Sequence, residues 1–173
     1  MAAPALLQAL SQQPQQGFIA IPQGRIVNTL ETWLKKTLKV GDCVQVGSIQ
    51  LAILPFLSSA DYDHLLWACD INCVRGEDSF IRAHWAAKPL LWHIYPQDED
   101  AHLDKLTAWQ QISSPFIDQT WQQLQQAWVK QDTNPNIWQT FLSTAQANKI
   151  GHQQFCDYLT QQDDLCQRLM SFA

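Results

Sequence analysis

The sequence predicts an α/β fold in which helices cover a parallel sheet, followed by a helical extension. In the first two thirds of the chain, short apolar runs of strand type alternate with helical patterns of about ten residues. Each apolar run is nearly continuous, as in strands that are buried on both faces of a parallel sheet. From Ala101 onward only helical periodicity is present. We therefore expect a sheet domain over residues 1–110 and a helical extension over residues 111–173.

The first elements are short and are separated by proline or glycine. Ala5 to Leu10 has a helical pattern, and an apolar strand at 18–21 stops at Pro22. A helix is predicted from Arg25 to Lys36, because its apolar residues recur at helical spacing. The remaining elements of the sheet domain are expected, in order, as strands at 44–46 and 51–54, a helix over 61–68, a strand at 70–74, a helix from about Glu77 and a strand over 89–95.

The composition limits the possible classes of protein. The 173 residues are enough to bury a core, and 46% hydrophobic residues with eight tryptophans indicate a packed interior. A net charge of −5 and the lack of a basic stripe exclude nucleic acid as the main partner. Five irregularly spaced cysteines are typical of a reduced cytoplasmic protein. The first residues contain neither a basic segment nor a long apolar run, so we expect no signal peptide and no membrane span.

The motif RGEDS at residues 75–79 is the most informative part of the chain. It follows a predicted strand and precedes a predicted helix, so it lies at the carboxyl end of a strand, where parallel sheets bind ligands. Asp78 and Ser79 are residue types that cap helices, and the first N–H groups of a helix have no partner within it. Such a turn is suited to an anion, above all a phosphate.

Two further residues of this motif favour an anion. Arg75 offers a planar fork of donors for phosphate oxygens, and Gly76 allows close approach of the backbone. Glu77 would repel a phosphate, so we expect its carboxylate to accept hydrogen bonds from hydroxyl groups of a ribose or sugar. The alternatives are a surface arginine paired with Glu77 or Asp78, and a glutamate that only stabilises the helix dipole.

A second loop, residues 55–59, also follows the carboxyl end of a predicted strand. It therefore supports a binding site at this edge of the sheet. An exposed ring at Phe56 would stack on a nucleobase, whereas the alternative is that Phe56 belongs to the core. No metal site is expected, because His84, His93 and His102 and the acidic run 98–100 match no metal-ligand spacing.

The order of these motifs resembles a known family. RGEDS, then F-x-R-A-x-W-A, then KPLLWHIYPQDEDAHLDKL is similar to the nucleotide-binding half of the protein-arginine rhamnosyltransferases that modify bacterial elongation factor P, the EarP family. The likeness is dense from about Leu54 to Leu106 and thin after Lys130. It implies a Rossmann-like sheet that forms the C-terminal half of an inverting, metal-independent glycosyltransferase of the GT-B type. The implied donor is dTDP-β-L-rhamnose, and the implied acceptor is an arginine of elongation factor P.

The resemblance also implies roles for single residues. Phe56 and Tyr62 would flank the base of the donor, with Ser59 in the same loop, although the family pattern has phenylalanine where this chain has Tyr62. The diphosphate and its sugars would be held by the motif at 75–79: Arg75, Gly76, Glu77, Asp78 and Ser79. Glu77 is the one candidate for a catalytic role, as a residue that positions the donor.

The acceptor-side carboxylates of the family belong to an N-terminal domain that this sequence does not resemble. We therefore expect the chain alone to bind the donor without transferring rhamnose. We also expect Trp121, Trp128 and Trp138 to contribute to an apolar surface that lacks this domain and favours self-association. The alternative is a non-catalytic nucleotide-binding or helical interaction module.

Overall fold

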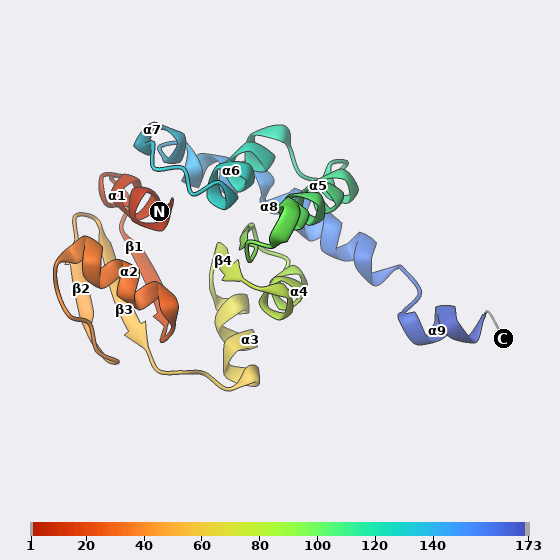
Figure 1. Cartoon of the computed structure of the whole chain (residues 1–173), viewed down its shortest axis with the longest axis horizontal. Helices are drawn as coiled ribbons and strands as arrows, with labels where there is room; N and C mark the ends of the chain where they lie inside the picture. Colours follow the sequence, from red (N-terminus) through yellow and green to blue (C-terminus); the bar gives the residue numbers. More distant parts are fainter. Residues whose placement is uncertain (1, 172–173) are drawn as a thin grey trace. The chain divides into compact units, whose positions relative to one another are not determined.

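The computed structural model describes residues 2–171 and has a mixed α/β architecture (Figure 1). Its elements are α1 (Ala2–Ser11), β1 (Gly17–Pro22), α2 (Arg25–Leu34), β2 (Cys43–Val46), β3 (Ile49–Leu54), α3 (Ser59–Ala68), β4 (Asn72–Arg75), α4 (Glu77–Trp85), β5 (Leu90–His93), the 3-10 turn η1 (Asp98–Asp100), α5 (Ala101–Ser113), α6 (Gln119–Val129), α7 (Pro135–Trp138), α8 (Phe141–Thr160) and α9 (Leu165–Met170). The chain divides into two compact units. The first unit contains Met1–Leu65 and Leu124–Ser143, and the second contains Leu66–Gln123 and Thr144–Ala173.

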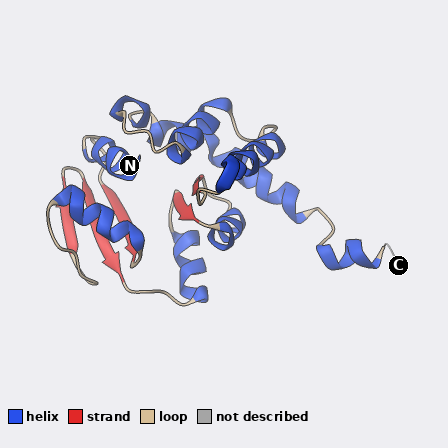
Figure 2. Cartoon of the chain, in the orientation of Figure 1, coloured by secondary structure: helices blue, strands red, loops and turns tan. Residues whose placement is uncertain are grey.

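The first unit contains a three-stranded sheet with the order β1-β3-β2, drawn in red in Figure 2. β1 and β3 are parallel, with Gly17 paired to Ile49 and Pro22 paired to Leu54. β2 runs antiparallel to β3, so the prediction that all strands are parallel is wrong for this strand. The physical reason is the connection of two residues, 47 and 48, because so short a turn can only join antiparallel neighbours.

The helices of the first unit pack by their apolar residues. α2 buries Val27 and Leu30, and it ends at Leu34 because Lys35 adopts a left-handed conformation with φ 51°. The predicted helix end at Lys36 was therefore two residues too late. α1 lies against α7 and buries Leu6, Leu7 and Leu10.

The second unit contains a pair of parallel strands, β4 and β5, with Asn72 paired to Leu90 and Arg75 paired to His93. The strand pairs β1–β3 and β4–β5 confirm the α/β class and the parallel pairing, but they belong to two sheets. A single Rossmann-like sheet stays a prediction, as does the division of the chain at residue 110.

A cluster of aromatic side chains forms the core of the second unit. Trp92 stacks on Phe80 with a centroid distance of 3.8 Å, and the ring of Trp109 meets Phe80 edge-on at 5.3 Å. His84 lies in the same cluster, 5.3 Å from the ring of Phe155. These contacts attach α4, β5, α5 and α8 to one another within the unit.

Close backbone packing fixes α8 to the segment before α6. A Cβ atom on Gly151 of α8 would overlap the carbonyl oxygen of Phe116, so only glycine fits there. Next to this contact, Asn148 accepts a 2.9 Å hydrogen bond from the backbone N–H of Asp118 and donates another to its carboxylate.

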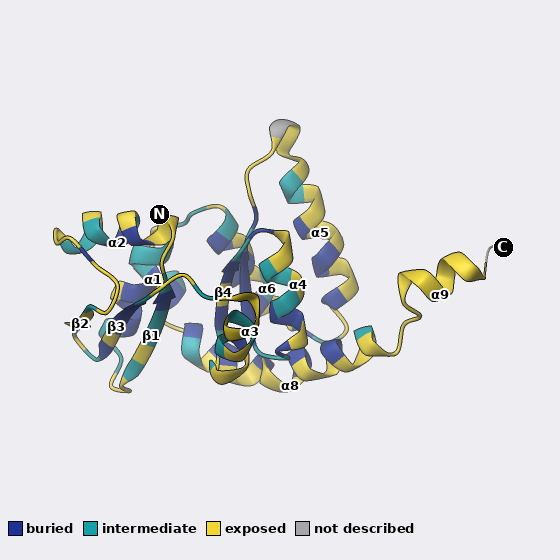
Figure 3. Ribbon diagram, turned by 90° about the horizontal axis from the view of Figure 1, so that it is seen from below, coloured by how far each residue is buried: buried dark blue, intermediate teal, exposed yellow. Residues whose placement is uncertain are grey.

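The tryptophans expected to be exposed are buried. Trp121 is 0%, Trp128 7% and Trp138 1% exposed, so the expectation that they contribute to an open apolar surface is wrong. Trp121 belongs to the second unit and donates a hydrogen bond to the carbonyl of Leu90, whereas Trp128 and Trp138 pack edge-on in the first unit. Figure 3 shows α9 exposed instead, and no residue of this helix is buried. Within residues 2–171, no helix combines the length and the apolar character needed to cross a membrane.

Candidate functional site

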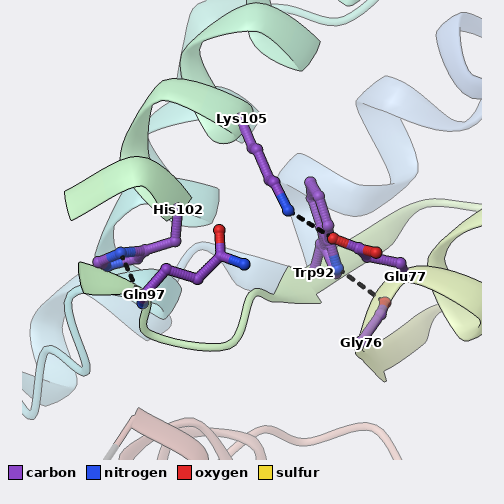
Figure 4. Close-up of polar contacts among 6 residues, drawn as sticks. All are labelled: Gly76, Glu77, Trp92, Gln97, His102 and Lys105. Atoms are coloured by element: carbon purple, nitrogen blue, oxygen red, sulfur yellow. Dashed lines mark hydrogen bonds and ion pairs between the residues drawn. The ribbon is translucent and has the colours of Figure 1, made fainter. Parts of the chain in front are cut away.

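The turn between β4 and α4 depends on the glycine at its centre. Gly76 is buried and has φ 77° and ψ 177°, a conformation that is almost exclusive to glycine. A Cβ atom at this position would lie 3.0 Å from Cε2 of Tyr95. The carbonyl oxygen of Gly76 accepts a 2.9 Å hydrogen bond from Nε1 of Trp92 (Figure 4). The close approach expected for Gly76 is thus made by aromatic residues of the β5 strand and the loop after it.

The first turn of α4 presents backbone N–H groups without a side-chain cap. The helix begins at Glu77, and its N-cap is Gly76, which has no side chain to accept a hydrogen bond. The expectation that Asp78 or Ser79 caps the helix is wrong, because both lie inside its first turn. The carboxylate of Asp78 instead forms an ion pair with Nε of Arg82 at 2.9 Å. This start of a helix retains the oriented donors that favour an anion.

Glu77 is paired with a lysine that the sequence did not indicate. Its Oε1 atom lies 2.6 Å from Nζ of Lys105, which belongs to α5 (Figure 4). Both side chains keep contact with solvent, at 68% exposure for Glu77 and 41% for Lys105. No spacing rule relates two residues that are 28 positions apart, so only the tertiary structure could reveal this pair.

Arg75 is held by an aromatic ring rather than by a carboxylate. Its Cζ atom lies 4.5 Å from the ring centroid of Tyr95, a cation–π arrangement. The Nε atom is buried and has no hydrogen-bond partner among the described residues. Burial, and in addition the positive charge of Arg75, lower the pKa of the neighbouring His93 below its ordinary value. The alternative of a surface arginine paired with an acidic neighbour therefore fails, since Glu77 and Asp78 pair with other cations.

The three other predicted site residues belong to the first unit and start at the end of β3. Phe56 lies in the loop before α3 and is 86% exposed, which excludes the alternative that it is a core residue. Ser59 is the first residue of α3 and is exposed, and Tyr62 lies one turn later and is half-buried. The start of α3 is stabilised by Ser58, whose Oγ accepts a 3.2 Å hydrogen bond from the backbone N–H of Asp61.

The histidines considered as metal ligands have other surroundings. His84 is buried among aromatic rings, and burial lowers its pKa to about 4. His102 accepts a 3.4 Å hydrogen bond from the backbone N–H of Gln97 (Figure 4). In the described part of the chain, no group of three or more His, Cys, Asp or Glu side chains is placed to hold a metal ion.

The structure thus brings Arg75, Gly76, Glu77, Asp78 and Ser79 together at one strand-to-helix turn. Sequence reasoning missed the residues that hold this turn from outside: Trp92, Tyr95 and Lys105. Trp92 and Tyr95 both lie in the strand predicted over residues 89–95, but strand alternation does not indicate that their rings contact the turn at 75–79.

Comparison with known proteins relates the whole chain to one family. The family model described as "Elongation-Factor P (EF-P) rhamnosyltransferase EarP" matches residues 1–173. A protein-arginine rhamnosyltransferase of Pseudomonas putida is 40% identical over 154 residues, which cover 76% of this chain and 41% of that protein. The protein-arginine rhamnosyltransferase of Pseudomonas aeruginosa is 46% identical over 112 residues, which cover 64% of this chain and 30% of that protein.

A solved structure supports the same relation. It concerns EarP-mediated arginine glycosylation of translation elongation factor EF-P, and it matches with a TM-score of 0.85 and 34% sequence identity. The match covers 99% of this chain and 56% of that chain. The chain therefore spans about half the length of the proteins it matches, or less.

Proposed function

The chain belongs to the EarP family of elongation factor P rhamnosyltransferases, and we propose that it is the donor-binding half of a two-domain, inverting GT-B enzyme. The whole enzyme would transfer rhamnose from dTDP-β-L-rhamnose to an arginine of elongation factor P. The observation that carries the donor role is the β4–α4 turn, where uncapped helix N–H groups lie next to the guanidinium of Arg75.

The diphosphate of the donor would bind at this turn. The backbone N–H groups of Glu77, Asp78 and Ser79 supply donors, and Arg75 supplies a cation with its direction set by Tyr95. In an inverting transfer, an arginine nitrogen forms a bond to the anomeric carbon while the bond to dTDP breaks. Negative charge then grows on the leaving diphosphate, so the same donors would stabilise the transition state more than the bound substrate.

Glu77 would position the donor sugar or the ribose. Its Oε1 atom is engaged by Lys105, and Oε2 is available to accept a hydrogen bond from a hydroxyl group. Phe56 and Tyr62 would stack on the thymine base with Ser59 beside them, and the 86% exposure of Phe56 supports this role. Tyr62 would place its hydroxyl next to a polar group of the ligand or in water.

Transfer to arginine also requires a base or carboxylate near the acceptor nitrogen, because a neutral guanidine is rare at ordinary pH. The acidic residues at the proposed donor site, Glu77 and Asp78, are already paired with Lys105 and Arg82. We therefore propose that the acceptor carboxylates come from an N-terminal domain and that this chain alone is inactive. The free thiols of the described cysteines agree with a cytoplasmic location, which we propose as well.

The test has two parts. Calorimetric titration of the chain with dTDP, UDP and dTDP-β-L-rhamnose should show binding of both thymidine ligands and a clear preference over UDP. Incubation with dTDP-β-L-rhamnose and elongation factor P should leave the acceptor mass unchanged, and addition of the N-terminal half of an EarP protein should add one deoxyhexose. Equal affinity for UDP would contradict the donor assignment, and modification by the chain alone would contradict the assignment of the acceptor carboxylates.

A further inference from the structure

The ion pair between Lys105 and Glu77 joins two elements of the second unit at the start of α4. Lys105 lies in the second turn of α5, and its Nζ atom is 2.6 Å from Oε1 of Glu77. Glu77 is the first residue of α4, where the uncapped backbone donors of the helix begin. The ion pair therefore lies beside the proposed diphosphate site. The inference drawn from it rests on the proposed function.

A carboxylate in this place opposes the binding of an anion. The first turn of α4 carries two acidic side chains, and a diphosphate that approaches the N–H groups would meet both charges. Each carboxylate is paired with a cation. Nε of Arg82, in the same helix, lies 2.9 Å from Oδ2 of Asp78, and Lys105 of α5 pairs with Glu77. The first pair is of the ordinary i,i+4 type and needs no tertiary structure. The second exists only because α5 packs beside α4.

The contact is also specific to one oxygen. Lys105 binds Oε1, so the carboxylate is held in one orientation and Oε2 is left as the acceptor for a ligand hydroxyl. The Glu77 side chain is 68% exposed even with Lys105 in contact. Without this lysine it would be free to rotate and would carry an unneutralised charge close to the diphosphate. Two effects follow from one contact: the repulsion of the donor falls, and the acceptor oxygen is oriented.

We propose that Lys105 is a positioning residue for the sugar nucleotide and acts on it through Glu77. It does not need to touch the ligand. A direct role as a phosphate ligand is the competing explanation, and the two differ in one respect: an indirect role disappears when Glu77 loses its charge, whereas a direct role persists.

A double-mutant cycle separates these explanations. The variants Lys105→Met, Glu77→Gln and their combination are titrated with dTDP-β-L-rhamnose by calorimetry, with Lys149→Met as a control for an exposed lysine of α8 in the same unit. Lys105→Met should weaken binding by about tenfold, because the donor then meets a Glu77 carboxylate that is neither neutralised nor oriented. In the Glu77→Gln background the same change should weaken binding by less than about threefold. Lys149→Met should bind like the wild type, and Lys105→Arg should restore most of the affinity, because a guanidinium also binds a carboxylate.

The outcomes are distinguishable. A tenfold loss that persists in the Glu77→Gln background would assign Lys105 to direct phosphate binding and overturn the inference. If the wild type binds and Lys105→Met binds with unchanged affinity, the role of Lys105 is overturned while the proposed donor function stands. Absence of binding by the wild type would overturn the proposed donor function, and this inference with it. Melting temperatures within about 2 °C of the wild type confirm that the surface variants are folded.

Discussion

The indole Nε1 of Trp92 donates a 2.9 Å hydrogen bond to the carbonyl oxygen of Gly76. The same indole ring stacks on Phe80, one turn into α4, at a centroid distance of 3.8 Å. One buried side chain of β5 therefore fixes both the residue that caps the helix and the first turn that follows. The proposed anion site gains its geometry from a strand that contributes no ligand-binding group of its own.

Replacement of Trp92 by phenylalanine should remove this hydrogen bond while it keeps an aromatic ring against Phe80. The carbonyl of Gly76 would stay buried without its partner, so the free energy of unfolding should fall by about 1 to 3 kcal/mol. Urea unfolding of the variant measures the change. Trp85→Phe is the matched control, since Trp85 is 49% exposed and should lose much less. Equal losses for the two variants would contradict the role of the hydrogen bond.

Gly76→Ala should destabilise the turn by about 1 to 3 kcal/mol, because its backbone conformation is strained for any residue with a Cβ atom and Tyr95 stands 3.0 Å from that atom. Gly24→Ala provides the comparison within the same chain. Gly24 is also the N-cap of a helix, but its φ of 167° is extended backbone and its nearest neighbour lies 3.9 Å away. Thermal unfolding should show a loss of stability for Gly76→Ala but not for Gly24→Ala. A similar loss of stability for Gly24→Ala would refute the explanation by backbone strain.

Arg75→Ala should weaken the binding of dTDP by about 1.5 to 3 kcal/mol, the range for hydrogen bonds to a charged group. Calorimetry with dTDP measures the effect, and Arg168→Ala on the exposed helix α9 tests whether loss of any positive charge suffices. We expect the control to bind like the wild type. A folded Arg75→Ala variant with unchanged affinity would remove Arg75 from the diphosphate site.

Phe56→Ala should reduce nucleotide affinity by about 1 to 3 kcal/mol if the ring stacks on the base. Its melting temperature should not change, because a ring that is 86% exposed contributes little to the core. Phe18 of β1 is 63% exposed and serves as the control, since Phe18→Ala should leave affinity intact. Loss of stability without loss of affinity would be the opposite of the expected pattern.

Two buried histidines should make the protein sensitive to acid. Burial lowers the pKa of His84 to about 4, and burial together with the charge of His84 lowers that of His152 to about 3. In the unfolded chain both would titrate near the ordinary histidine pKa of about 6.5. Between that value and the folded pKa, the unfolded state binds more protons, so stability is full above about pH 6.5 and falls as the pH decreases.

The slope should approach about 1.4 kcal/mol per pH unit for each histidine. Urea midpoints at about pH 7 and about pH 5 measure it. A midpoint that is the same at both pH values would show that the two buried histidines do not control acid stability.

The order of strands and helices could be predicted because each apolar run is bounded by glycine or proline. β1 ends at Pro22, and β3 is followed by Pro55. The direction of β2 was missed because its apolar pattern is the same for parallel and antiparallel pairing. Only the length of its connection to β3 decides between the two. The predicted strands already left only residues 47–50 between them, too few for a parallel crossover, so this length could have revealed the antiparallel direction.

The central turn of the candidate site could also be predicted, since residues 75–79 are contiguous and carry their chemistry in local order. The residues that hold this turn from other elements could not be predicted. Lys105 lies in another helix, and neither helical spacing nor strand alternation relates it to Glu77. The N-cap was predicted at Asp78 or Ser79 from residue type, but the structure places it at Gly76, where the backbone conformation outweighs capping preference.

The contact between Gly151 and the carbonyl oxygen of Phe116 has a consequence for how tolerance to mutation would be interpreted. In a library with every amino acid at every position, variants at 151 should be depleted as strongly as variants of a ligand-binding residue, although glycine has no functional group. Depletion alone would therefore mark a false active-site position on α8. Sorting the same library once for soluble protein and once for nucleotide capture separates the two cases, because substitutions at 151 should disappear already in the first sort.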